Sequence, residues 1–193
     1  GGHTFSHVNL TRVPLREARE EITRCRMELQ DITGRELVAF CYPWGAYNKA
    51  VVKVVRNAGF KGARTTRCFR TRMTNPYEFG TTIHTHNHAV LYYVRELVCA
   101  KNWKLLRFLA RPNTLTGDWR KIAISCLNHI ARSGGIWHLW GHSWDIERQN
   151  AWRKLDDVFK AIGEMADTHN LSLMDNSQLI LGAQTDECSN LEC

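Results

Sequence analysis

The stretch Glu36–Gly45, ELVAFCYPWG, joins a short apolar run to a turn of proline, tryptophan and glycine. A brief apolar run that stops at such a turn is typical of a buried β-strand. The next residues, Tyr47–Ala58, have helical spacing and stop before Gly59, and Phe60–Thr65 are expected to form the next strand. This order of strand, helix and strand predicts a parallel sheet with a crossover helix, which is the unit of an α/β fold.

Apolar residues at helical spacing predict further elements on both sides of this unit. The expected helices cover residues 14–33, an interrupted stretch at 89–110, a stretch from a cap at Asp118 to Gly134, and a stretch from Trp152 to Met165. The expected strands cover residues 136–140 and 171–174. Residues 66–88 are polar, and Arg64, Arg67, Arg70 and Arg72 are expected to form a solvated loop, not a dedicated anion site.

The composition is that of an ordinary globular domain with a core, since 44% of the 193 residues are hydrophobic and 23% are charged. We expect one domain over residues 1–180, followed by a polar tail over 181–193. No run of about 18 apolar residues occurs, so no transmembrane helix is expected. The formal net charge of +7 is not gathered into a basic stripe with interleaved aromatic residues, so nucleic acid is not an expected partner.

The seven cysteines show neither a Cys-x-x-Cys pair nor regular spacing, which indicates neither a zinc ribbon nor a disulfide scaffold. Cys25, Cys41 and Cys126 fall within predicted helices and a predicted strand, where a free cysteine usually acts as a small buried hydrophobe. This usage favours a reducing, cytoplasmic compartment and leaves a signal peptide open. Cys188 and Cys193 both lie in the expected tail and could form a disulfide with each other.

Two histidines, His3 and His7, lie four residues apart at the start of the chain. At this spacing both imidazoles can meet one metal ion from a helix face or from a tight turn after a strand. Catalytic Zn²⁺ usually takes three protein ligands and a water, so a third ligand must come from elsewhere. On spacing alone, a surface or capping role is the competing interpretation.

A second histidine pair, His138 and His142, lies in the aromatic segment WHLWGHSWD at residues 137–145. Two-residue alternation places both on one side of the predicted strand, so parity does not separate them. His142 follows the strand, where the chemistry of α/β barrels takes place, whereas His138 lies within it. Position therefore favours His142 over His138 as the candidate for chemistry, and His138 is expected to be a hydrogen-bonded core residue.

Together with GHTFSH at residues 2–7 and FCYPWGAYN at residues 40–48, this segment resembles the second, third and fifth motifs of the polysaccharide deacetylases, the NodB-homology domain of carbohydrate esterase family 4. The resemblance runs from Gly2 to about Leu179. It implies an irregular (β/α) barrel of about seven strands. The family's first motif, Thr-Phe-Asp-Asp-Gly on the first strand, does not occur in this sequence. We therefore expect a barrel that lacks its first strand and helix.

The resemblance also implies a divalent metal ion, Zn²⁺, with His3 and His7 as two of its ligands and an aspartate of the first motif as the third. His142 corresponds to the histidine that acts as general acid on the leaving amine. In many members an arginine that holds the catalytic base occupies the place of Cys41. The sequence departs from the family pattern there.

The third motif implies an oxyanion hole and a sugar groove. Its backbone N–H after the proline, here that of Trp44, helps to form the oxyanion hole, and its aromatic residue walls the groove. Tyr42 and Pro43 belong to the same turn, for which an ordinary Pro-Gly turn is the simpler interpretation. Trp144 is expected to line the pocket beside His142.

Two further features have simpler explanations. Asp118 and Trp119 match the fourth motif, but an aspartate before a helical stretch is also a good N-cap. His84, His86 and His88 alternate as in a strand and would place three imidazoles on one face, as in a second metal site for which the family offers no counterpart.

The resemblance therefore implies a metal-dependent hydrolase that removes N-acetyl or related acyl groups from an amino sugar polymer, chitin-like or peptidoglycan-like, or from another carbohydrate. The alternative is a catalytically incomplete remnant of the same fold that binds carbohydrate. A weaker third hypothesis is a basic adaptor for anionic polymers, whose binding would collapse with added salt.

Overall fold

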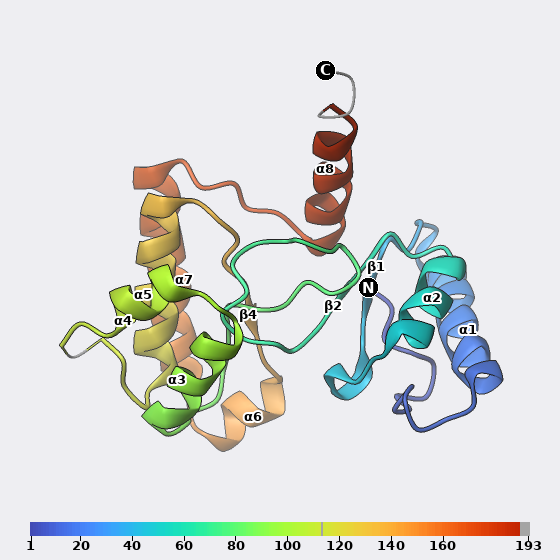
Figure 1. The fold of residues 1–193 in the computed structure, drawn as a ribbon, viewed down its shortest axis with the longest axis horizontal. Helices are drawn as coiled ribbons and strands as arrows, with labels where there is room; N and C mark the ends of the chain where they lie inside the picture. Colours follow the sequence, from blue (N-terminus) through green and yellow to red (C-terminus); the bar gives the residue numbers. More distant parts are fainter. Residues whose placement is uncertain (113, 190–193) are drawn as a thin grey trace. The chain divides into compact units, whose positions relative to one another are not determined.

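The structure is a computed structural model that describes the backbone of residues 1–112 and 114–189, with side chains in these ranges as far as Ala183. The chain divides into two compact units (Figure 1). The first contains residues 1–66, 73–79 and the chain from Met174 onward, and the second contains residues 67–72 and 80–173. Each unit has its own hydrophobic core.

The first unit is built on the expected strand, helix and strand. Strand β1 (Ala39–Cys41) pairs in parallel with β2 (Gly62–Arg64), and α2 (Lys49–Asn57) connects them. Isolated bridges of Gly2 to β1 and of Phe79 to β2 continue the pairing on both sides. Two further helices, α1 (Leu15–Thr33) and α8 (Asn176–Ser189), complete the unit, with α1 lying against α2 (Figure 1).

Local signals set the limits of these helices. Asn48 caps α2, because its side chain accepts a hydrogen bond from the Val51 N–H at 3.0 Å. Helix α1 ends at Gly34, which adopts φ 63° and donates its N–H to the carbonyl of Gln30. The apolar faces of the two helices and the strands bury Ile22, Phe40, Val51, Val55 and Phe60 in one core.

The second unit contains the short parallel pair β3 (Ile83–His84) and β4 (Leu139–Trp140) among five helices. The helices are α3 (Val90–Cys99), α4 (Trp103–Leu109), α5 (Trp119–Ser133), α6 (Ser143–Arg148) and α7 (Trp152–His169). Trp119 is fully buried and packs with Leu97, Leu105 and Val158 in the core.

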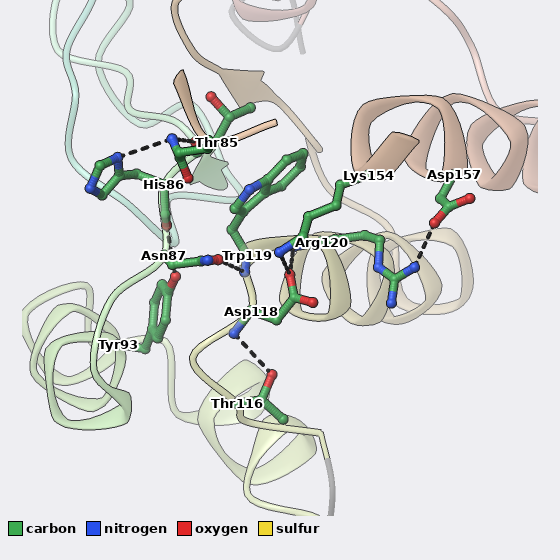
Figure 2. Close-up of polar contacts among 11 residues, drawn as sticks. Thr85, His86, Asn87, Tyr93, Thr116, Asp118, Trp119, Arg120, Lys154 and Asp157 are labelled. Atoms are coloured by element: carbon green, nitrogen blue, oxygen red, sulfur yellow. Dashed lines mark hydrogen bonds and ion pairs between the residues drawn. The ribbon is translucent and has the colours of Figure 1, made fainter. Parts of the chain in front are cut away.

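Asp118 caps α5, as the simpler interpretation of its position predicts. Its carboxylate accepts hydrogen bonds from the Arg120 N–H at 3.0 Å and from Lys154 Nζ at 3.1 Å, and Arg120 pairs with Asp157 (Figure 2). Lys154 and Asp157 lie on α7, so these contacts fasten the start of α5 to α7. The capping role is confirmed, and a catalytic role for Asp118 stays a hypothesis.

Several predicted elements are confirmed and others are corrected. The helix at 14–33 has the predicted limits, and the interrupted stretch at 89–110 is two helices, of which Asn102 caps the second by accepting from the Leu105 N–H. The expected strand at 171–174 is wrong, because these residues carry no regular structure. Residues 181–189, expected in a polar tail, belong to α8, and a Cys188–Cys193 pairing falls outside the residues whose side chains are described.

The α/β class is confirmed by two parallel strand pairs connected through helices. Within the described residues the strands form two separate two-stranded sheets, and no closed barrel of about seven strands appears. Along the chain from β2 to β3, isolated backbone hydrogen bonds replace regular strand pairing. Examples are Thr65 N–H to Phe79 O and Phe69 N–H to Thr82 O, both at 2.9 Å. Helices account for most of the regular structure.

None of the helices that the structure describes is long and apolar enough to cross a membrane.

Candidate functional site

The first candidate cluster, which we call the His3 cluster, consists of His3, His7 and Trp44 in the first unit. The rings of His3 and His7 meet edge to face with centroids 4.8 Å apart, and the rings of His7 and Trp44 meet similarly at 5.3 Å. Gly2 pairs with β1 through hydrogen bonds to Ala39 and Cys41, so His3 immediately follows a strand-like segment. The two predicted metal ligands are therefore together.

A tight turn, not a helix, brings the two histidines together. Thr4 and His7 have φ angles of 61° and 59°, in the left-handed region. The carboxylate of Glu21 on α1 holds the loop by accepting hydrogen bonds from the N–H groups of Phe5 and Ser6 at 3.0 and 2.8 Å. These hydrogen bonds anchor the loop between His3 and His7 to α1.

The ring of His3 has a defined orientation. Its Nδ1 lies 2.7 Å from the carbonyl oxygen of Cys41 at the end of β1. A carbonyl only accepts, so Nδ1 carries a proton in this contact, and in a neutral ring Nε2 is then the nitrogen with the lone pair. Carbonyl partners orient metal-binding histidines in this way.

The turn at Pro43–Gly45 forms one turn of 3₁₀ helix in which Trp44 adopts φ 61°. Its hydrogen bonds run from the Gly45 N–H to Tyr42 O and from the Ala46 N–H to Pro43 O, at 2.9 and 3.0 Å. Non-glycine residues in this backbone region are strained, and such residues cluster at functional sites. The Trp44 side chain is 71% exposed.

Buried neighbours hold the turn in place. Tyr42 is fully buried, donates its hydroxyl to the carbonyl of Tyr77 at 3.0 Å and stacks on Tyr47. Pro43 is buried as well. A Cβ on Gly45 would lie 2.2 Å from Thr66 Oγ1, so only glycine fits there.

Arg64 is the clearest residue that the sequence misplaces. It is expected in a solvated loop, but it lies buried on β2, opposite Cys41 in the register of the pair. Its Nε donates to Asn176 at 2.6 Å, its guanidinium lies over the ring of Phe79, and burial lowers its pKa to about 10. Burial also raises the pKa of the Cys41 thiol, with Arg64 opposing the shift, so this cysteine is neutral.

The other loop arginines are less buried than Arg64. Arg67 and Arg72 are exposed, as expected. Arg70 instead donates to the carbonyls of Cys99 and Ala100 at the end of α3, at 3.0 and 3.3 Å. A cation at a helix C-terminus is favourable, so Arg70 has a structural role.

The second candidate cluster, the His142 cluster, lies in the second unit and consists of His142, Trp144 and Asp145. His142 follows β4 and precedes α6, and its Nδ1 lies 3.3 Å from Asp145 Oδ2. The Trp144 ring stacks on the imidazole with centroids 4.2 Å apart and is itself 60% exposed. A carboxylate beside one ring nitrogen orients the imidazole.

His138 differs from His142 as expected. Its Nδ1 lies 2.9 Å from the hydroxyl of the buried Thr81, and its carbonyl accepts from the Thr82 N–H at 3.0 Å. These contacts join the start of β4 to the segment before β3. The hydrogen bonds predicted for His138 are confirmed, but the residue is half-buried and precedes β4, whereas the sequence predicts a core position within the strand.

The histidines of the alternating stretch also lie close together. Ring centroids are 4.8 Å apart for His84 and His88, 5.2 Å for His86 and His88, and 6.5 Å for His84 and His86. Burial lowers the pKa of His84 to about 4, with smaller contributions from His88 and His86.

The described residues contain no group of three His, Cys, Asp or Glu side chains arranged to hold a metal ion as they stand. The His3 cluster fits two of the ligand positions that the resemblance implies, with one ring oriented by a carbonyl. The third ligand stays an expectation.

Comparison with known proteins agrees with the resemblance over the first part of the chain. Residues 1–63, which are 63 of the 193 residues, match the family model described as polysaccharide deacetylase. The matched range contains the His3 cluster and ends before the His142 cluster. None of the curated protein sequences matches the chain.

Two solved structures resemble part of the chain. The Streptococcus pyogenes deacetylase PplD in complex with acetate is 20% identical with a TM-score of 0.39, over 40% of this chain and 35% of that chain. A polysaccharide deacetylase from Bacillus cereus is 22% identical with a TM-score of 0.35, over 40% of this chain and 25% of that chain. The matched region thus spans about a third or less of either relative.

Proposed function

We propose, from the premise that residues 1–63 are similar to the polysaccharide deacetylase family, that the protein is a hydrolase that removes N-acetyl or related acyl groups from a carbohydrate. The reaction splits a carbon–nitrogen bond that is not a peptide bond. Its substrate class is an N-acetylated amino sugar polymer, chitin-like or peptidoglycan-like.

In this proposal His3 and His7 hold a divalent metal ion, Zn²⁺, and an aspartate of the family's first motif completes the ligand set. When bound, the ion would polarise the acyl oxygen and lower the pKa of water toward about 7. The contact of His3 Nδ1 with the Cys41 carbonyl supports the assignment, because it orients the ring so that Nε2 is the nitrogen available to a metal ion.

The Trp44 N–H acts in the proposal as a donor to the oxyanion that develops on the acyl group. The turn uses the N–H groups of Gly45 and Ala46 for its own hydrogen bonds and holds Trp44 in a strained conformation beside His7. A preorganised donor of this kind typically supplies about 3 kcal/mol of transition-state stabilisation.

His142 protonates the departing nitrogen. It gives one proton to the amine as the carbon–nitrogen bond breaks, and Asp145, whose Oδ2 lies 3.3 Å from His142 Nδ1, orients the ring.

In this proposal the exposed indole of Trp44 in the first unit and that of Trp144 in the second unit are each a candidate contact for a sugar ring. Tyr42 and Pro43 are buried, so they shape the turn from beneath. The finer fold assignment, an irregular barrel that includes a first strand preceding His3, also belongs to the proposal. The bridge of Gly2 to β1 supports it, because it gives the segment before His3 the pairing of a strand.

The single observation that carries the proposal is the meeting of His3, His7 and Trp44 from two separated motifs. The test is acetate release from chitooligosaccharides and from peptidoglycan fragments, using a chain that also includes the upstream segment. We expect activity that a chelator removes and Zn²⁺ restores. Trp44→Ala keeps the N–H and should raise KM more than it lowers kcat. Absence of acetate release from every N-acetylated glycan would contradict the proposal.

The alternative is a non-catalytic carbohydrate-binding remnant, which the absence of a third ligand in the described residues favours. Binding to chitooligosaccharides distinguishes the two. The remnant should bind them with equal affinity before and after chelation and release no acetate. The enzyme should release acetate only with metal.

A further inference from the structure

His84, His86 and His88, which we call the His84 cluster, have no part in the proposed reaction. His84 ends β3 and the other two follow at alternate positions, with Tyr92 of α3 stacked on His88 at 3.8 Å between ring centroids. Tyr93 donates its hydroxyl to the His86 carbonyl at 3.0 Å, which fixes the backbone between the histidines (Figure 2). Three imidazoles are thus held on a short, anchored segment.

The distance between two of these rings is informative. The Nε2 atoms of His84 and His88 lie 3.2 Å apart. In a tetrahedral zinc site, bonds of about 2.0–2.1 Å to imidazole nitrogen place two such nitrogens roughly 3.3 Å apart. The pair is therefore already at the separation that one ion requires.

The surroundings favour a ligand role over a surface role. His84 and His88 are both half-buried, and Tyr92 packs against both rings, with its hydroxyl 3.3 Å from His84 Nε2. Without metal, one Nε2 donates to the other. Binding needs the proton on Nδ1 of both rings, which is a change of tautomer with no change of charge.

The third histidine needs only to rotate. His86 is exposed, its centroid is 5.2 Å from that of His88, and its Nδ1 lies 3.3 Å from Gln149 Nε2. Its distance of 6.5 Å from His84 explains why the described residues form no set of three as they stand. Rotation of an exposed side chain costs little compared with a metal–imidazole bond.

We propose that the His84 cluster binds a divalent transition metal ion of the Zn²⁺ class, with Nε2 of His84 and His88 as preformed ligands and His86 as a third that turns inward. Water would complete the tetrahedron. All three ligands are imidazoles, so the site should take Zn²⁺, Co²⁺ or Ni²⁺ and reject Mg²⁺ and Ca²⁺, which prefer oxygen.

The experiment uses the chain of residues 1–193 with His3 and His7 replaced by alanine, so that its outcome is independent of the proposed function. After chelation and removal of the chelator, Zn²⁺ is titrated by calorimetry and Co²⁺ by its visible spectrum. We expect one ion per chain and tetrahedral Co²⁺ bands. His84→Ala or His88→Ala should raise Kd at least about tenfold, and His86→Ala should raise it less.

His129→Ala is the matched control, because His129 is a half-buried imidazole in the same unit that packs on Phe108. It should bind as the parent does. Zn²⁺ should also raise Tm of the parent and of the control, because an ion that binds the folded state stabilises it, and should leave Tm of the His84 and His88 variants unchanged. If His84→Ala fails to fold, His88→Gln gives the same test. Equal Kd in parent and ligand variants, or no ion bound by the parent, would overturn the proposal.

Discussion

His3 Nδ1 lies 2.7 Å from the carbonyl oxygen of Cys41, so the backbone at the end of β1 orients the first candidate ligand. The contact uses the peptide group of Cys41 and not its thiol, whose pKa is raised by burial.

The first prediction concerns metal binding by the His3 cluster. In a chain that includes the upstream segment, His3→Ala and His7→Ala should each lose one equivalent of bound Zn²⁺, because each removes an imidazole from the pair. Cys41→Ala should lose none, because the carbonyl remains. Metal content after dialysis measures both. Undiminished Zn²⁺ in the double variant would show that these histidines are not ligands.

The second prediction separates the two candidate acids. His142→Ala should lower kcat by roughly 10² to 10⁴ with metal content unchanged, because a positioned acid is lost. His138→Ala should mainly lower Tm, since it leaves a cavity and unpairs the buried Thr81 hydroxyl from its ring. Steady-state kinetics and thermal melts are compared. The assignment is reversed if a stably folded His138→Ala enzyme is inactive while His142→Ala retains kcat.

The third prediction concerns the backbone before His142. A Cβ on Gly141 would lie 2.0 Å from Thr85 Oγ1, so Gly141→Ala should destabilise the chain by about 1–3 kcal/mol in urea unfolding. Gly163→Ala is the control, because Gly163 lies in α7 with no atom within 4 Å of the added methyl group. That change should be neutral or stabilising, by about 0.5–1 kcal/mol. Equal effects at both sites would contradict the predicted clash.

The fourth prediction concerns alkaline stability. Burial raises the pKa of Tyr93 from 10.0 to about 12. Above the ordinary pKa the unfolded chain releases the phenol proton while the folded chain keeps it, so the contribution of Tyr93 to stability is complete below pH 10 and is lost toward pH 12. Tyr93→Phe should therefore lose less of its unfolding free energy across this range. An identical pH dependence in both proteins would show that Tyr93 does not titrate on unfolding.

The sequence by itself determined the elements whose information is local. The helix at 14–33 follows from the spacing of its apolar residues and ends at a glycine, and both signals act within a few residues of where they lie. Asp118 as a cap and His138 as a hydrogen-bonded residue were predictable for the same reason. The motif spacing also pointed to His3, His7 and His142 as candidates.

The boundary between α3 and α4 also has a local signal in the sequence. Asn102 interrupts the helical stretch at 89–110 and caps α4, which marks the boundary between its two helices. Leu171–Met174 is apolar enough for a strand but has no strand to pair with in the described residues. A strand needs a partner, and composition does not supply one.

Only the tertiary structure decided which side chains meet. Arg64 is one of four arginines in an arginine-rich segment. Parallel pairing of β2 with β1 buries Arg64, whereas the other three arginines stay more exposed. The 3.2 Å separation of His84 and His88 Nε2 likewise depends on Tyr92 of α3 packing against both rings. Sequence spacing determines which residues share a face of a helix or strand. The distances between their atoms depend on how whole helices and strands pack, and the free energy of that packing is a sum over many residues.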